Sequence, residues 1–271
     1  MCRHLAYLGP PATLRSVIVD PPHGLYTQGW APRFQRHGEV NADGFGVGWY
    51  SPGDPDPARY RQAVPIWADQ SFADLARVTK ASALLAAVRN ATPGPGWCPA
   101  AVAPFRDGRW LFSHNGVLDG WPASAAGLAA SLPVTALLEL EARVDSALAW
   151  ALVLHRLRGG LAPAQALTDT IGALRAAGVT GRFNFLLTDG RVIAATAAGD
   201  TLFYRRAAGV TVASEPADDE PGWIEVPGGS VVTAVPRQVC VTPLRALSPQ
   251  DCGITDLTPI PQTPDGRIAI S

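Results

Sequence analysis

Residues 2–9 are Cys-Arg-His-Leu-Ala-Tyr-Leu-Gly, and this opening stretch decides how the fold begins. The apolar run from Leu5 to Leu8 stops at Gly9-Pro10-Pro11, which is too soon for the apolar core of a secretory signal. We therefore expect a strand, with the thiol of Cys2 at its first residue as a candidate nucleophile. The rest of the chain has to supply the layers that cover this strand.

The elements predicted after this strand are further strands, then two consecutive helices, then strands again. The expected strands are 2–9, 44–50, 82–89, 109–114, 182–188, 191–197, 201–206, 209–214, 230–235 and 239–244, and the expected helices are 69–80, 145–157 and 163–177. Each sheet must bury a face, so this order predicts an α+β fold and fits a four-layer αββα sandwich. We expect one domain over residues 1–245 and an irregular, proline-containing tail over 246–271.

The charge balance and the cysteines exclude several classes of function. The chain has 22 basic and 23 acidic residues, whereas a nucleic-acid-binding surface needs a clustered basic excess, so we expect no nucleic-acid partner. No apolar run approaches the length of a membrane span, about 18 residues or more, so we expect no membrane association. The cysteines and histidines lack the spacing of a metal site. A cytoplasmic protein with reduced thiols is the default expectation.

Cys2 offers a nucleophile and a base in one residue. A small side chain at the second position allows removal of Met1, which would leave a free α-amine on Cys2. An α-amine titrates near ~7.7–8.0 and a thiol near ~8.5, so the amine can accept the thiol proton at neutral pH. Enzymes with an N-terminal threonine follow the same logic. The alternative is that a cysteine stands at this position by chance.

Asn115 and Gly116 follow the predicted strand 109–114. The side-chain amide of Asn115 and the backbone N–H of Gly116 can donate two hydrogen bonds to a developing oxyanion. An Asn-Gly pair is also the commonest hairpin turn, so the turn remains an open alternative.

Arg89 and Asp145 are candidate partners for a charged ligand. Arg89 leaves a buried strand beside Thr92 and a glycine-rich loop, which suits a forked clamp on a carboxylate, although an ordinary salt bridge explains it equally well. Asp145 begins a predicted helix, where we expect an N-cap whose carboxylate can also hold an ammonium group. The glycines of residues 41–49 do not form a dinucleotide motif, and we expect them to let their strand pass close to the N-terminal strand.

Taken together and in this order, the segments resemble the class II glutamine amidotransferases, whose fold is the N-terminal-nucleophile (Ntn) αββα sandwich. The matching stretches are Met1 to His4, Asn41 to Trp49, Arg89 to Gly94, Ser113 to Gly116, Asp145-Ser146, and Ala213 to Pro216 with Trp223. The chain departs from the family at two positions, with Ala87 where many members have histidine and Arg3 where many have glycine.

The resemblance implies a role for each candidate and no metal or organic cofactor. Cys2 becomes the nucleophile and, through its amine, the base, while Asn115 and Gly116 form the oxyanion hole. The other assigned residues bind the γ-glutamyl group of the substrate: Arg89 and Thr92 its α-carboxylate, Asp145 its α-ammonium, and Ala91 and His114 as further contacts.

The expected activity is that of an amidohydrolase with a small-molecule γ-glutamyl substrate. Residues 246–271 are too few for the acceptor domain of a multi-domain amidotransferase. The strings DPPHGL (20–25), NADGFGVGW (41–49), AAVRNAT (86–92), HNGVLD (114–119) and VASEPADDEPGW (212–223) are most similar to compact members that cleave γ-glutamyl-hercynylcysteine sulfoxide in ergothioneine biosynthesis. Trp30, Trp97 and Trp121 are candidate contacts for the trimethylammonium of that leaving group, or else packing residues.

Two other functions stay open. One is a glutaminase subunit that delivers ammonia to a partner synthetase, and the other is a non-catalytic module that binds γ-glutamyl compounds. A cysteine protease is disfavoured because no histidine has a motif context for a Cys–His pair. The oligomeric state is open, with a homodimer as one option.

Overall fold

The computed structural model describes residues 2–91 and 98–245. The strands are β1 (Arg3–Thr13), β2 (Phe45–Trp49), β3 (Ala58–Gln62), β4 (Lys80–Val88), β5 (Phe105–Asp107), β6 (Trp110–Leu118), β7 (Gly181–Thr188), β8 (Ile193–Ala197), β9 (Phe203–Arg206), β10 (Val210–Ala213), β11 (Ile224–Glu225), β12 (Ser230–Val235) and β13 (Gln238–Pro243). The α-helices are α1 (Leu14–Ile18), α2 (Gln70–Val78), α3 (Ala126–Ala130), α4 (Val134–Leu138), α5 (Asp145–Arg158) and α6 (Pro163–Ala176).

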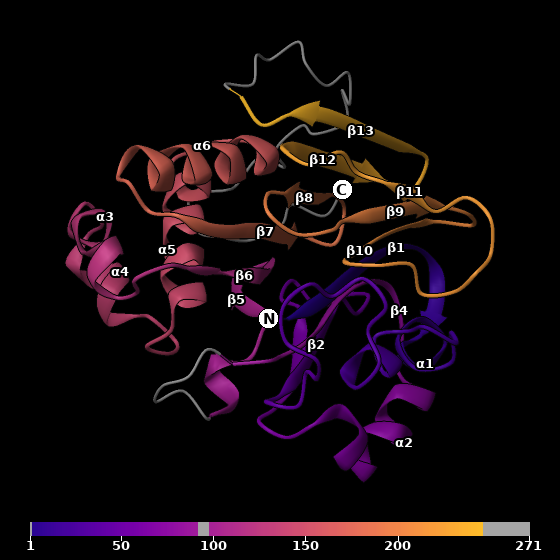
Figure 1. Cartoon of the computed structure of the whole chain (residues 1–271). Helices are drawn as coiled ribbons and strands as arrows, with labels where there is room; N and C mark the ends of the chain where they lie inside the picture. The colour runs from indigo at the N-terminus through magenta and orange to yellow at the C-terminus, as the bar shows by residue number, and fades with distance from the viewer. Residues whose placement is uncertain (1, 92–97, 246–271) are drawn as a thin grey trace.

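Two antiparallel sheets form the centre of the molecule. The first has the strand order β11-β9-β10-β1-β4-β2-β3, and the second has the order β13-β12-β8-β7-β6-β5. Helices α5 and α6 lie against the second sheet, while α1 and α2 lie on the opposite side of the molecule, against the first (Figure 1). The predicted αββα sandwich is confirmed.

Three apolar cores hold the layers together, and the alternation of side chains along each strand divides residues between them. In β1, Leu5 joins the core beneath α1 and α2, whereas Ala6 and Leu8 join the core between the two sheets. In β6, Leu111 joins the core between the sheets, whereas Phe112 joins the core beneath α5 and α6. Strands β1 and β6 therefore face each other across the middle of the sandwich. Past the apolar residues of each strand, every second side chain also points into the space between the two sheets.

The predicted strands and long helices are present, and three local expectations are wrong. Strand β6 continues to Leu118, so Asn115 and Gly116 lie inside a strand instead of a hairpin turn. The N-cap of α5 is Val144, and Asp145 is the first residue of the helix. The glycines of β2 do not approach β1, because β4 lies between them; a Cβ at Gly46 would instead collide with the carbonyl oxygen of Ala103.

Strands β3 and β5 were not expected from the sequence. Each is short and pairs at the outer edge of its sheet, where neither needs a long apolar run. The expected tail over 246–271 lies outside the described residues. Within the described part of the chain, no helix is long and apolar enough to cross a membrane.

Candidate active site

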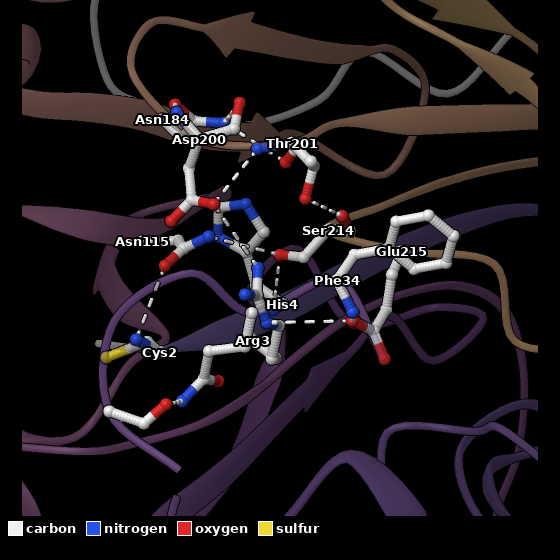
Figure 2. Close-up of polar contacts among 12 residues, drawn as sticks. Cys2, Arg3, His4, Phe34, Asn115, Asn184, Asp200, Thr201, Ser214 and Glu215 are labelled. Carbon is white, nitrogen blue, oxygen red and sulfur yellow. Dashed lines mark hydrogen bonds and ion pairs between the residues drawn. The ribbon is translucent and has the colours of Figure 1, made fainter. Parts of the chain in front are cut away.

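Cys2 and Asn115 are 113 residues apart in sequence and meet at one end of the sandwich. The backbone nitrogen of Cys2, which directly precedes β1, donates to Oδ1 of Asn115 in β6 over 3.3 Å (Figure 2). Asn115 is fully buried and Cys2 is partly buried, so the thiol lies at the border between the core and solvent. The structure thus places the candidate nucleophile beside a candidate oxyanion donor.

Because successive side chains of a strand point to opposite faces, β6 contributes to the candidate site on one face and contacts α5 on the other. Ser113 and Asn115 share the face of Leu111, toward the other sheet, and Ser113 Oγ lies 3.1 Å from Nδ1 of His4. His114 points to the opposite face, where Nδ1 lies 3.1 Å from Ser146 Oγ of α5 and Nε2 lies 2.8 Å from the Arg182 carbonyl oxygen. Both ring nitrogens of His114 are therefore engaged by protein groups, so its expected contact with substrate could be made only by its main chain.

The backbone at Gly116 leaves no room for a side chain. A Cβ at this position would collide with the carbonyl oxygen of Arg182 in the neighbouring strand β7. Any side chain would therefore push β6 away from β7 beside Asn115. The glycine preserves the close pairing of the strand that carries the candidate oxyanion donor.

Arg89 is brought to Cys2 by strand register. Arg3 pairs with Val88 between β1 and β4, so the same antiparallel register places Cys2 opposite Arg89. Arg89 is 9% exposed, and its backbone is held by hydrogen bonds to Gly44 and Asp43. The carboxylate of Asp43 also accepts the backbone N–H of Ala91 over 2.7 Å, so this N–H is already engaged. The expected partner Thr92 lies outside the described residues.

Asp145, the first residue of α5, contacts the last residue of β6, Leu118, which lies three residues along that strand from Asn115. Its Oδ2 accepts the backbone N–H of Leu118 over 3.0 Å, and its Oδ1 accepts the N–H of Ser146 over 2.8 Å. Among the described residues no basic side chain forms an ion pair with this carboxylate, which is 9% exposed at a helix N-terminus. Asp145 is thus a fixed negative charge that can accept an ammonium group.

His4 is neutral in the folded protein. Burial, with smaller contributions from the nearby Arg3 and His114, lowers the pKa of His4 to about 3. Burial also lowers the pKa of His114, while Asp145 opposes that shift. Neither imidazole is therefore charged at neutral pH, and the charge beside Cys2 comes from other residues.

A cluster of buried charged residues begins at Arg3, next to Cys2, and was not assigned from the sequence. The guanidinium of Arg3 is fully buried, with Nη1 3.7 Å from Asp200 and Nε 3.9 Å from Glu215, and both carboxylates are also fully buried (Figure 2). Burial lowers the pKa of Arg3, whereas Asp200 and Glu215 oppose this. Glu215 further accepts the backbone N–H groups of Arg33 and Phe34 over 3.0 and 2.8 Å, so it ties the residue after Cys2 to the 33–34 loop.

The sequence contains one indication of this cluster, because Arg3 departs from the glycine that many family members have at this position. Arg3 was noted only as a departure from glycine, and Ser214-Glu215 only as part of a matching string. A charged residue inside an otherwise apolar strand requires buried partners, and Glu215 follows a strand that pairs with β1. That reasoning would have suggested Glu215 as the partner of Arg3.

The tryptophan candidates divide into three cases. Trp30 is 43% exposed and packs edge-on against Trp67, with ring centroids 5.6 Å apart. Trp121 packs against the core beneath α5 and α6, which favours the packing alternative. Trp97 lies outside the described residues. Within the described residues, no group of three or more metal-binding side chains is present.

Comparison with known proteins identifies the family of the chain. The family model of class-II glutamine amidotransferases matches residues 24–220. The chain is 43% identical to a γ-glutamyl-hercynylcysteine sulfoxide hydrolase of Mycolicibacterium smegmatis over 246 residues, covering 90% of this chain and 100% of that protein. A Mycobacterium tuberculosis protein of the same name is 42% identical over 252 residues, covering 92% of this chain and 100% of the relative.

A solved structure shares the fold. A glutamine amidotransferase class-II domain protein from Silicibacter pomeroyi superposes with a TM-score of 0.64 at 24% identity, over 90% of this chain and 100% of that one. The family match and the long, complete alignments to relatives support one conclusion. The chain belongs to the class-II glutamine amidotransferase family.

Proposed function

We propose that the protein hydrolyses the γ-glutamyl amide bond of γ-glutamyl-hercynylcysteine sulfoxide, a step of ergothioneine biosynthesis, and releases glutamate. The observation that carries the proposal is the meeting of Cys2 with Asn115, in a chain that aligns over the full length of hydrolases with that name. We place the reaction in the cytoplasm, where a catalytic thiol stays reduced.

The reaction starts once Met1 has been removed, so that the nitrogen of Cys2 is a free amine. This amine takes the proton of the Cys2 thiol, and the sulfur attacks the γ-carbonyl carbon to give a tetrahedral oxyanion. The amide of Asn115 and the backbone N–H of Gly116 donate to that oxyanion. The amine then passes its proton to the leaving nitrogen, the C–N bond breaks, and a γ-glutamyl thioester remains on Cys2.

Water completes the cycle. The amine accepts a proton from the water molecule that attacks the thioester, the C–S bond breaks, and the thiol is regenerated as glutamate leaves. The Asn115 Oδ1 atom, 3.3 Å from the Cys2 nitrogen, holds this amine by accepting a hydrogen bond from one of its N–H groups. The lone pair of the amine therefore stays available. One residue thus serves as nucleophile and base in both halves of the reaction.

Two charges select the γ-glutamyl group. Arg89, opposite Cys2 in register, would bind the α-carboxylate, and Asp145 would bind the α-ammonium. The α-carboxylate and the α-ammonium keep their charges during the reaction. These two residues therefore contribute to binding more than to the chemical step.

A direct test compares two substrates with the purified enzyme. We expect γ-glutamyl-hercynylcysteine sulfoxide to be cleaved with a much higher kcat/KM than free glutamine, with both products followed by mass spectrometry. A preference for glutamine, together with ammonia release that a synthetase stimulates, would instead identify a glutaminase subunit. Tight binding of either compound without cleavage would identify a non-catalytic binding module.

A further inference from the structure

Ser214 accepts hydrogen bonds from two strands that belong to different sheets, and the mechanism above does not use it. Its Oγ accepts from the backbone N–H of His4 over 3.1 Å and from Nδ2 of Asn115 over 3.4 Å (Figure 2). Ser214 and Asn115 are both fully buried, so solvent cannot replace either contact. Ser214 therefore connects the start of β1 to the residue assigned to the oxyanion.

The position of Ser214 is itself fixed by its main chain. Its N–H donates to the carbonyl oxygen of His4 over 2.9 Å, and its carbonyl oxygen accepts from Thr201 Oγ1 over 2.8 Å. Thr201 is held in turn, because Nδ2 of Asn184 donates to its carbonyl oxygen over 3.2 Å. The Oγ of Ser214 is thus held at a fixed place, and the Asn115 carboxamide that bonds to it is held there as well.

The carboxamide of Asn115 has two chemically different ends, and its terminal torsion has two broad minima that exchange them. In the observed orientation Oδ1 faces the Cys2 nitrogen and one N–H of Nδ2 faces Ser214. In the reversed orientation an N–H of Asn115 would donate to the lone pair of the Cys2 amine. That lone pair would then be unavailable for the thiol proton.

We infer that Ser214 is a positioning residue for the proposed hydrolysis: its bond to Nδ2 holds the Asn115 carboxamide beside Cys2, with Oδ1 toward the amine and the second N–H of Nδ2 free for the oxyanion. The inference rests on the proposed function. It also gives the Ser214 position of the matching string Ala213 to Pro216 a task beyond packing.

The test is a double-mutant cycle on kcat with a matched control. Ser214→Ala should lower kcat about tenfold, the factor that one net hydrogen bond supplies, and leave KM unchanged. Adding Ser214→Ala to Asn115→Ala should have no further effect on kcat, because Ser214 acts through Asn115. Ser113→Ala is the control, because Ser113 is equally buried and bonds to His4, whereas among the described residues its side chain forms no hydrogen bond with Cys2 or Asn115.

Three results would overturn the inference: a Ser214→Ala enzyme with wild-type kcat, losses that multiply in the double variant, or an equal loss of kcat in Ser113→Ala. Thermal unfolding of each variant checks that it is folded. If Ser214→Ala does not fold, Ser214→Cys replaces the hydroxyl with a somewhat larger thiol that is a weaker acceptor, and its kcat should fall in the same direction without a change in KM.

Failure of the proposed function gives a different pattern. A wild-type enzyme without γ-glutamyl hydrolysis, or an Asn115→Ala enzyme with full turnover, rejects the function or the oxyanion assignment. The positioning claim is then decided by an atomic-resolution crystal structure of Ser214→Ala, in which amide nitrogen and oxygen can be distinguished. A reversed or disordered Asn115 carboxamide supports it, and an unchanged one contradicts it.

Discussion

Replacing Glu215 by alanine should destabilise the protein more than any exposed acidic substitution. The Glu215 carboxylate is fully buried, accepts two backbone N–H groups of the 33–34 loop, and lies 3.9 Å from the equally buried guanidinium of Arg3. Alanine removes the acceptor and its charge while Arg3 stays in place. Among the described residues, the buried Arg3 would then keep a single ion-pair partner, Asp200, 3.7 Å away.

The size of the effect follows from this geometry. Breaking a buried ion pair by removing one partner costs about 3–5 kcal/mol in the free energy of unfolding. The two lost N–H contacts to a carboxylate belong to the same network, so they are part of that cost instead of a separate addition. For a domain of this size, a loss of about 4 kcal/mol lowers Tm by roughly 8–16 °C.

Urea unfolding followed by circular dichroism, with Tm measured in parallel, provides the assay. Glu225→Ala is the matched control: Glu225 is an exposed glutamate, so its removal should change the free energy of unfolding by no more than about 0.5 kcal/mol. A Glu215→Ala loss below about 1 kcal/mol, or one equal to that of the control, would refute the reasoning that Arg3 needs this carboxylate.

Three further predictions concern catalysis and pH. Asn115→Ala should lower kcat by on the order of 10²–10³, as loss of one oxyanion donor does, and an unchanged kcat would remove Asn115 from the oxyanion hole. Arg89→Ala should chiefly raise KM, because the α-carboxylate keeps its charge, and an effect confined to kcat would argue against the clamp. The lowered pKa of His4, about 3 against an ordinary value of 6.5, means that the unfolded chain binds a proton between these values while the folded chain does not. Stability should therefore fall as pH drops from about 6.5 toward 3, by up to about 1.4 kcal/mol per pH unit, and His4→Gln should flatten this dependence in urea titrations. An unchanged pH slope in His4→Gln would contradict the assignment.

The layers of the fold could be predicted because local pattern and burial agree along most strands. The continuous apolar run 82–89 and the glycine-rich 44–50 each became a strand of the first sheet, and the two consecutive helices became the layer over the second. The local errors share a cause. Asn115-Gly116 has the composition of a turn, but pairing with β7 keeps it in a strand, and sequence-local chemistry contains no information about that partner.

For the candidate site, local motifs in the sequence supplied the candidate residues but not their contacts. Cys2, Asn115 and Arg89 were each identified from a local motif, and the strand register then placed Cys2 opposite Arg89. The hydrogen bonds of Ser214 and Glu215 could not be foreseen, because each joins segments about 100 to 210 residues apart. Only the folded structure shows which donors bond to Ser214 and Glu215.

The claim that the Cys2 residue supplies both sulfur and amine can be tested in one experiment. The purified enzyme is mixed with γ-glutamyl-hercynylcysteine sulfoxide, quenched in acid during turnover, digested and mapped by mass spectrometry. We predict that the N-terminal peptide begins at Cys2 and carries one γ-glutamyl group as a thioester, while the peptides of Cys98, Cys240 and Cys252 remain unmodified. An active enzyme that retains Met1, or a γ-glutamyl group attached to another cysteine, would contradict the account.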